Sequence, residues 1–212
     1  YCMGTLYWQF NDCWPVTSWS SLDYYGNWKA FHYQAKRSFE NVLLSAEITD
    51  SGIYKFFVIN DGMQNYAGEL KAEIRNFKGQ LLWEKKAYCK SDASSNVAAI
   101  LLPFPSLKEF DTQNSYLKME FISDDNYWES NFFFEKPKDL KLSKPNIEIK
   151  TIDEVTIEIS SDVLAKDVFL YSENEVFFED NYFDLLPNEK RIIKLSKAVK
   201  EIKVKSLFDT MK

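Results

Sequence analysis

Glycine, cysteine and histidine are all scarce in this sequence. Its 212 residues include 6 glycines, 3 cysteines and 1 histidine. So little glycine excludes collagen-like and low-complexity architectures. The odd number of cysteines gives no complete disulfide framework, and no Cys/His spacing is typical of a zinc site. The cysteines are interpreted as small buried thiols, while a bridge between Cys2 and Cys13 stays open, as does the cellular compartment.

The single histidine, His32, lies beside the apolar face of a predicted helix. No serine or cysteine stands at a spacing that would complete a catalytic triad with it. A structural or solvent-facing role is therefore favoured for His32. Without a metal-ligating cluster or an EF-hand loop, no metal or other cofactor is predicted.

Long hydrophobic runs and an excess of positive charge are missing as well. No apolar run reaches about 18 residues, so no membrane span is predicted. The formal net charge is −6 at pH 7, and an acidic chain is a poor partner for a phosphate backbone, so no nucleic-acid partner is predicted. Because the chain begins with Tyr1 rather than methionine, we expect further sequence to precede it.

Aromatic residues, by contrast, are abundant at 17% of the sequence. Aromatic side chains fit the pleated surface of a sheet, and about seven segments show the alternation or the short apolar runs of strands. These segments are residues 42–48, 54–60, 69–75, 80–86, 96–102, 115–123 and 126–135. Short strands at this spacing predict a first β-sandwich.

A proline- and lysine-rich stretch, KPKDLKLSKP, follows at residues 136–145 and is typical of an interdomain linker, or of a final strand that runs into one. Strand patterns then resume in a second, smaller sandwich. The predicted strands are residues 147–151, 155–160, 168–171, 175–178, 191–195 and 201–207. Residues 180–186 are expected to form a turn from which Phe183 and Leu185 pack inward. A unit of about 65 residues is marginal alone, so we expect it to lean on its neighbour.

The first forty residues follow another pattern. Residues 6–10 (LYWQF) predict a short strand, a polar aromatic loop continues through Gly26, and residues 28–39 (WKAFHYQAKRSF) have near-helical spacing of apolar groups. A single strand–loop–helix unit is one repeat of an α/β structure and cannot fold alone. We therefore expect the helix to pack on the first sandwich or on a neighbouring chain, with Trp28 and Phe31 covered.

This opening segment carries a resemblance to a known family. The run GTLYWQFNDCWPVTSWSSLDYYGNWKAFHYQAKRSF, residues 4–39, resembles the eighth strand, loop and helix of the catalytic barrel in glycoside hydrolase family 2 β-mannosidases. A second run, FFEDNYFDLLPNEKR at residues 177–191, is similar to the signature of their terminal immunoglobulin-like domain. Glu179 stands where that signature often has serine, and Asn188 where it often has glycine. The middle part is similar more weakly, through LKAEIRNFKGQLLWE at residues 70–84.

The resemblance implies a mainly β fold class with two immunoglobulin-like β-sandwich domains preceded by the strand–loop–helix remnant of a (β/α)8 barrel. Residues 1–40 would be the last βα unit of the barrel. Residues 41–138 would be the first immunoglobulin-like sandwich, and residues 139–212 the smaller C-terminal one. The chain would then be the C-terminal portion of such an enzyme, with the upstream barrel as its intramolecular partner.

The resemblance also implies an exo-acting hydrolase that removes terminal non-reducing β-D-mannose residues from oligosaccharides with retention of configuration. That chemistry needs two carboxylates about 5–5.5 Å apart. In the family both are glutamates on earlier barrel strands, so no catalytic residue is assigned in this chain. The 212-residue chain alone is predicted to be inactive, with a structural or interdomain role for its sandwiches.

The loop after residues 6–10 would line the mouth of the barrel, where such enzymes bind substrate. Aromatic rings suit the C–H face of a sugar, and amides or carboxylates suit its hydroxyls. By the resemblance Trp8 is the candidate platform for the terminal sugar, with Asn11 and Asp12 beside it, and Trp14 and Trp19 are weaker candidates. Packing between the barrel rim and a sandwich would explain each tryptophan equally well.

A different class of function also fits a pair of sandwiches, namely a carbohydrate-binding or adhesion module. That function requires exposed aromatic side chains on the sandwich surface, and the candidates are Tyr66, Trp83, Tyr127 and Trp128. Their alternation with apolar neighbours favours core positions, which favours the enzyme-fragment interpretation. The sugar also stays open, because related family 2 enzymes act on galactose, glucuronic acid or glucosamine.

Overall fold

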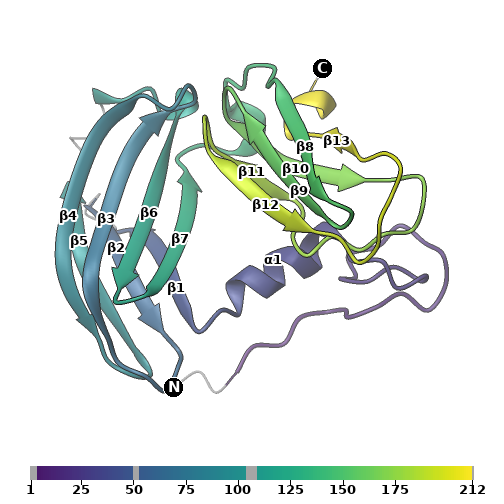
Figure 1. Ribbon diagram of the computed structural model, residues 1–212. Helices are drawn as coiled ribbons and strands as arrows, with labels where there is room; N and C mark the ends of the chain where they lie inside the picture. The colour runs from purple at the N-terminus through teal and green to yellow at the C-terminus, as the bar shows by residue number, and fades with distance from the viewer. Residues whose placement is uncertain (1–3, 50–52, 104–108, 212) are drawn as a thin grey trace.

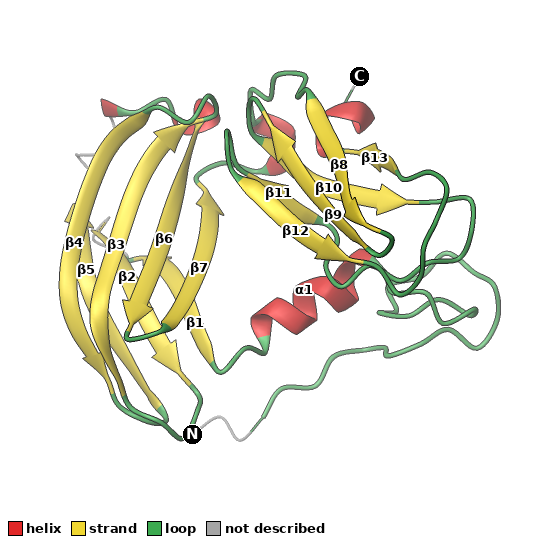
Figure 2. Cartoon of the chain, viewed as in Figure 1, coloured by secondary structure: helices red, strands yellow, loops and turns green. Residues whose placement is uncertain are grey.

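The structure is a computed structural model that describes residues 4–49, 53–103 and 109–211. Two β-sandwiches stand side by side, and a single helix lies beneath the second of them (Figure 1). The N-terminal stretch contains no strand among its described residues and runs as a long loop below both sandwiches (Figure 2). The predicted mainly β fold class with two immunoglobulin-like sandwiches is confirmed.

The first sandwich contains all seven predicted strands. One sheet has the order β1-β2-β5 and the other β4-β3-β6-β7, and every neighbouring pair is antiparallel. The strands are β1 (Val42–Ile48), β2 (Ile53–Asn60), β3 (Tyr66–Asn76), β4 (Leu81–Ser91), β5 (Ser95–Pro103), β6 (Ser115–Ser123) and β7 (Asn126–Phe133). A 3-10 helix, η2 (Thr112–Asn114), leads into β6. Two sheets face to face around one core are the immunoglobulin-like architecture.

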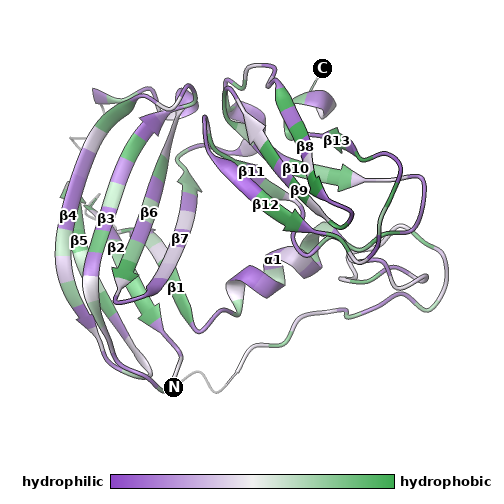
Figure 3. Cartoon of the chain, viewed as in Figure 1, coloured by the Kyte–Doolittle hydropathy of each residue, from purple (hydrophilic) through white to green (hydrophobic). Residues whose placement is uncertain are grey.

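The core of the first sandwich follows from the alternation of its strands. Phe56 of β2, Leu70 of β3 and Phe121 of β6 are all fully buried, and hydrophobic and hydrophilic stretches alternate along β3 and β6 in Figure 3. One glycine is required by close packing: a Cβ on Gly68 of β3 would lie 1.9 Å from the carbonyl oxygen of Ile122 on β6. The strand pair β3–β6 therefore needs glycine at this position.

The second sandwich has two three-stranded sheets, β12-β9-β8 and β11-β10-β13. Its strands are β8 (Ile147–Asp153), β9 (Thr156–Ser161), β10 (Ala165–Tyr171), β11 (Phe183–Leu185), β12 (Lys190–Lys194) and β13 (Lys203–Lys205), followed by the 3-10 helix η4 (Leu207–Thr210). The strand predicted at residues 175–178 is wrong, because only Phe178 forms a bridge, to Leu195. β10 pairs instead with β11 and β13. The turn predicted at residues 180–186 is wrong for residues 183–185, which form β11, but Phe183 and Leu185 are each 2% exposed and pack inward as predicted.

A third hydrophobic cluster joins the two sandwiches. Its buried members are Phe77, Tyr116, Leu140, Leu164 and Leu186, which come from both sandwiches and from the stretch between them. The backbone N–H of Leu164 donates to the carbonyl of Phe77 at 2.9 Å. The stretch predicted as a linker contains the 3-10 helix η3 (Pro137–Asp139) and buries Leu140 in this cluster. The second sandwich thus leans on its neighbour, as its size predicts.

Residues 6–10 form no strand, so the prediction for this segment is wrong. Leu6, an apolar residue, is 99% exposed. The physical reason is that a strand satisfies its backbone groups only with a neighbouring strand, and none of the described strands pairs with this segment. Its backbone instead accepts bonds from a loop, through Ser21 N–H to the Gln9 carbonyl at 3.1 Å and Leu22 N–H to the Phe10 carbonyl at 2.9 Å.

The predicted helix is confirmed as α1 (Ala30–Ser38), but its expected packing partner is wrong. It lies against the second sandwich, where the hydroxyl of Tyr33 donates to the carbonyl of Phe178 at 3.0 Å. Tyr33 is 3% exposed, whereas Phe31 is 39% exposed. The side of the helix that carries Tyr33 is buried because it packs on the loop at residues 177–182. The spacing of apolar groups in the helix does not indicate which sandwich it contacts.

The cysteines divide by position. Cys89 is buried on β4, as predicted, whereas Cys13 is exposed, so its interpretation as a buried thiol is wrong. Cys13 is exposed because none of the described strands packs over the loop that contains it. Cys2, and with it the open question of a Cys2–Cys13 bridge, lies outside the described residues.

Candidate functional site

Residues 4–28, called the aromatic segment below, carry the side chains that the sequence singles out for sugar binding. Trp8 is 77% exposed and Trp14 is 65% exposed, and Asn11 lies on the surface with them. Trp19, the weaker candidate, is 70% exposed. The structure therefore leaves these rings and the amide at the surface of the described chain, where the sequence-based hypothesis of sugar contact requires them to be.

Asp12 differs from its neighbours because its side chain turns inward and is 4% exposed. Its carboxylate accepts hydrogen bonds from the hydroxyl of Ser18 at 2.6 Å and the hydroxyl of Ser20 at 2.8 Å, and from Lys29 Nζ at 2.7 Å. The hydrogen bond from Lys29 is the main reason that the pKa of Asp12 lies below its ordinary value. Asp12 is thus an ionised anchor that closes the loop between residues 12 and 20.

The rest of the segment is ordered by turn chemistry. The Asp23 carboxylate accepts from the backbone N–H groups of Tyr25 and Asn27, both at 2.8 Å, and Gly26 adopts a φ of +85° that favours glycine. Partial burial would raise the pKa of Asp23, but the hydrogen bonds from Asn27 and Tyr25 outweigh it and lower the pKa. This turn leads into Trp28, two residues before α1 begins at Ala30.

His32 lies on α1 with its ring centroid 4.1 Å from that of Trp28 and 6.1 Å from that of Phe10. Desolvation lowers the pKa of His32, so the imidazole is neutral at pH 7. Among the described residues, its Nδ1 is buried without a hydrogen-bond partner. These aromatic contacts support the structural role that the sequence favours.

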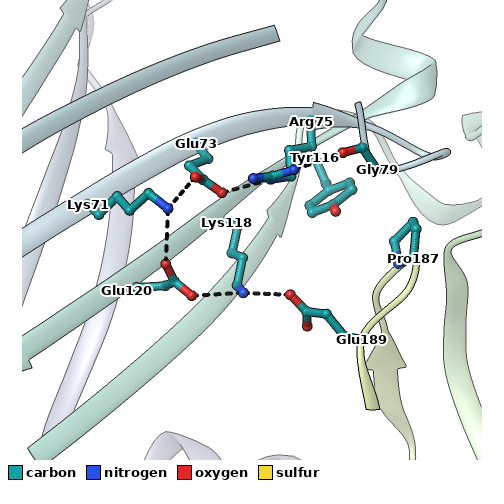
Figure 4. Close-up of a pocket in the computed structure, with 9 residues that line it drawn as sticks. All are labelled: Lys71, Glu73, Arg75, Gly79, Tyr116, Lys118, Glu120, Pro187 and Glu189. Atoms are coloured by element: carbon teal, nitrogen blue, oxygen red, sulfur yellow. Dashed lines mark hydrogen bonds and ion pairs between the residues drawn. The ribbon is translucent and has the colours of Figure 1, made fainter. Parts of the chain in front are cut away.

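A second polar site, which sequence reasoning missed, lies where the first sandwich faces the second. It is a cavity of about 180 Å³. Its lining residues, drawn in Figure 4, come from β3, β6 and the turns on either side of the interface: Lys71, Glu73, Arg75, Gly79, Tyr116, Lys118, Glu120, Pro187 and Glu189. The site is called the interface cavity below.

Opposite charges alternate across the two strands that form the floor of the interface cavity. In the β3–β6 register Lys71 lies opposite Glu120 and Glu73 lies opposite Lys118. Lys71 pairs with Glu73 and Glu120, and Arg75 Nε donates to Glu73 at 2.7 Å (Figure 4). Cross-strand pairs of opposite charge stabilise a sheet, and here they also neutralise the floor of the cavity.

Lys118 connects this floor to the second sandwich. Its ammonium group lies 2.8 Å from Glu120 and 2.7 Å from Glu189, which precedes β12 (Figure 4). The whole residue is 8% exposed. Burial would lower the pKa of Lys118, but the hydrogen bonds to the two glutamates outweigh it and raise the pKa. The ammonium of Lys118 thus links β6 of the first sandwich to the turn before β12 of the second.

Glu73 is the most strongly shifted carboxylate of the cavity. Burial would raise its pKa, but hydrogen bonds from Arg75 and Lys71 outweigh it and lower the pKa to about 2. All three groups are therefore charged at pH 7. Each of these charges already has an oppositely charged partner, so the interface cavity differs from the mostly apolar pockets that bind small molecules.

The signal for this cavity was present in the sequence. In residues 69–75 charged residues alternate with apolar ones, and Lys118 and Glu120 interrupt an otherwise apolar strand. A lysine and a glutamate at i and i+2 in such a strand point to the same face, opposite the core. The missing information was that a second sandwich covers that face, which follows only from the fold.

Of the four aromatic residues named for a carbohydrate-binding module, three pack on the core and one is exposed. Tyr66, Trp83 and Trp128 pack against the core of the first sandwich, as the alternation predicts. Tyr127 is 51% exposed, so its assignment to the core is wrong. Its hydroxyl bonds with Glu120 at 2.9 Å and Glu129 at 2.8 Å, because it faces the charged side of the sheet. A single tyrosine bonded in this way is no flat aromatic platform.

No group of three or more His, Cys, Asp or Glu side chains in residues 4–49, 53–103 and 109–211 could hold a metal ion. Within the same ranges no helix has the length and apolar character of a membrane-spanning helix.

Comparisons with known proteins place this fold among glycosidases. Residues 52–139 match the family model of the mannosidase Ig/CBM-like domain, and residues 142–210 match that of the Ig-fold domain of mannosidases. β-Mannosidase B of Thermothelomyces thermophilus is 26% identical over 98% of this chain and 27% of its own length. β-Mannosidase of Rattus norvegicus is 38% identical over 37% of the chain and 9% of its own length.

A solved structure gives the same result in three dimensions. The crystal structure of a β-D-mannosidase from Dictyoglomus thermophilum superposes with a TM-score of 0.78 and 27% identity, covering 94% of this chain and 25% of that one. The chain therefore spans about a quarter of the length of the relatives that it matches from end to end. It is a homologue of part of the glycoside hydrolase family 2 β-mannosidases and carries their immunoglobulin-like domains.

Proposed function

We propose that this chain is the C-terminal part of a retaining exo-β-mannosidase, an enzyme that removes terminal non-reducing β-D-mannose residues. The observation that carries the proposal is the similarity to β-mannosidases over 98% of the chain, together with the TM-score of 0.78 to one of them. Because the chain corresponds to only 27% and 25% of those proteins, the activity belongs to a longer protein. The substrate is a mannose-containing oligosaccharide.

The proposed organisation follows the predicted boundaries. Residues 1–40 are the last βα unit of a catalytic barrel, residues 41–138 the first immunoglobulin-like domain and residues 139–212 the second. Both catalytic glutamates lie upstream, so the chain by itself performs no hydrolysis. The two sandwiches hold the barrel and each other in place, a role that the interface cavity supports through the pairing of Lys118 with Glu189 at 2.7 Å.

The upstream barrel is the proposed partner of the aromatic segment. Leu6 is 99% exposed, Phe10 57% and Val16 47%, beside three exposed tryptophans. A soluble protein rarely leaves so many large apolar groups in one segment uncovered. Residues 6–10 become the eighth strand when the seventh and first strands of the barrel lie on either side of them.

Within that barrel we propose that Trp8 is the platform for the terminal mannose, with Asn11 near its hydroxyls and Trp14 at the rim. Asp12 was predicted in the same group. Its inward bonds to Ser18, Ser20 and Lys29 support a role in shaping the loop that carries the other three.

The test is hydrolysis of p-nitrophenyl β-D-mannopyranoside by two preparations, the purified 212-residue chain and the longer protein that contains it. We expect turnover by the longer protein only. The p-nitrophenyl β-galactoside, β-glucuronide and β-glucosaminide are matched controls. Faster hydrolysis of one of these by the longer protein would show that its substrate sugar is not mannose. Robust turnover by the 212-residue chain would contradict the upstream location of the glutamates. Binding of mannan by the isolated sandwiches would favour the carbohydrate-binding module instead.

A further inference from the structure

The sandwich that holds α1 is the one farther away in the sequence. Arg37, in the last turn of the helix, donates through Nη1 to Asp180 Oδ1 at 2.7 Å and to the carbonyl of Asn181 at 3.2 Å. Its Nη2 donates to the carbonyl of Tyr182 at 3.0 Å. The flat guanidinium presents several donors in a fixed fork, which suits three acceptors on one loop.

The loop that receives Arg37 is itself fixed to the second sandwich. Asn181 is 3% exposed, and its side chain accepts from the N–H of Leu170 at 2.8 Å and donates to the carbonyl of Leu170 at 2.9 Å. These paired bonds imitate a strand partner for β10. Tyr182 has a φ of 52°, which turns the chain so that it continues into β11. The acceptors for Arg37 are therefore part of a rigid loop.

Contacts along the helix add to this attachment. Lys36 Nζ donates to the carbonyl of Glu179 at 3.0 Å, and Tyr33 donates to the carbonyl of Phe178 at 3.0 Å. The rings of Trp28 and Phe177 meet edge to face with centroids 4.6 Å apart. Five consecutive residues of the loop, 178–182, thus contribute an acceptor or a buried anchor to one helix.

The other end of α1 is hydrogen-bonded to the aromatic segment. Lys29 immediately precedes the helix, and its Nζ donates to Asp12 at 2.7 Å and to Ser20 at 2.7 Å. Its backbone N–H donates to the carbonyl of Ser21 at 2.9 Å. A helix is stiff over this length, so a shift at Arg37 would move Lys29 and with it the loop that carries Trp14 and Trp19.

We propose that Arg37 and Asp180 are positioning residues, through which the second sandwich sets the place of the substrate-contacting loop. The proposal rests on the proposed mannosidase function for its consequence in catalysis. The Arg37 side chain bonds only to residues 180–182 among the contacts of the described chain, so we assign neither it nor Asp180 a contact with the sugar. Their effect passes through α1, Lys29 and Asp12 to the aromatic segment, and small displacements of substrate-contacting groups weaken binding.

Hydrogen exchange on the 212-residue chain tests the attachment without reference to activity. In Arg37→Ala we expect the amides of α1 and of residues 12–22 to exchange about 10-fold faster, because three bonds to a charged donor are lost. The amides of β3 and β6 should be unchanged. Lys190→Ala removes an exposed pair with Glu158 on the same sandwich, 2.8 Å long and without contact to α1, and should leave α1 unchanged. Equal exchange of α1 in wild type and Arg37→Ala would overturn the proposal.

Kinetics of the longer protein test the positioning role. We expect Arg37→Ala to raise KM for p-nitrophenyl β-D-mannopyranoside about 5- to 10-fold with less than about a 2-fold change in kcat. Arg37→Lys, which keeps a positive charge for Asp180, should recover most of the affinity. A fall in kcat with unchanged KM would overturn the positioning role. Wild-type protein without mannosidase activity would overturn the proposed function, and hydrogen exchange would still decide whether the attachment exists.

Discussion

The first sandwich builds its two sheets from strands of 7 to 11 residues, whereas the strands of the second have 3 to 7. Their strand orders nevertheless correspond. The sheet β1-β2-β5 matches β8-β9-β12, and β4-β3-β6 matches β11-β10-β13. Only β7 has no counterpart among the described residues, because the 3-10 helix η4 (Leu207–Thr210) follows β13 there.

The shorter strands leave the second sandwich with a smaller core and more external support. α1 covers it on one side through Tyr33 and Trp28, and the cluster around Leu164 and Leu186 covers it on another. The first sandwich instead closes around its own fully buried residues, such as Phe56 and Phe121. The comparison teaches that one strand order can be self-sufficient or dependent, according to how much apolar area its strands bury.

The largest expected effect concerns the self-sufficient core. Phe121→Ala removes a ring that is 0% exposed, and we expect it to lower the free energy of unfolding of the first sandwich by about 3–5 kcal/mol. Ile122→Ala, the next residue on β6 and 49% exposed, is the matched control and should cost less than about 1 kcal/mol. Denaturant titration followed by circular dichroism measures both. Equal losses of unfolding free energy in the two variants would mean that burial of Phe121 does not stabilise the first sandwich.

A smaller effect is expected where the second sandwich leans on the first. Leu164 is 2% exposed in the shared cluster, and Leu164→Ala should cost about 2–4 kcal/mol. The loss should fall on the second sandwich, so calorimetry should resolve an earlier transition for that sandwich alone. Ile152→Ala, on the same sandwich and 52% exposed, should leave a single transition. One shifted but undivided transition in Leu164→Ala would argue against a dependent second sandwich.

The smallest effect concerns the acid stability of the interface cavity. The pKa of Glu73 is lowered from 4.5 to about 2, so its charged form stabilises the folded chain above pH 4.5. This contribution, about 1–3 kcal/mol, is lost as the pH falls from 4.5 towards 2. Glu73→Gln should therefore flatten the dependence of stability on pH across that window. Identical acid-unfolding curves for the two proteins would show that the charge network contributes nothing to the interface.

The sandwiches were predictable because alternation records burial directly, as it does for Leu70 and Ile74 of β3, which are both 0% exposed. The remaining differences come from contacts that no local pattern contains. Residues 6–10 have the composition of a strand and form none, because a strand needs a neighbour. Asp12 looked like a sugar ligand in the sequence, and only the fold brings Lys29 to it. No local pattern around Lys118 indicates that Glu189, 71 residues later, pairs with it.

The structure of the longer protein tests the central claim most directly, namely that this chain is completed by a catalytic barrel. We expect residues 6–10 to form a strand there with parallel partners on both sides, and Leu6, 99% exposed in the isolated chain, to become buried. Trp8 should then face the sugar site while Asp12 keeps its bond to Lys29. A structure in which residues 6–10 remain an unpaired, exposed loop would contradict the account.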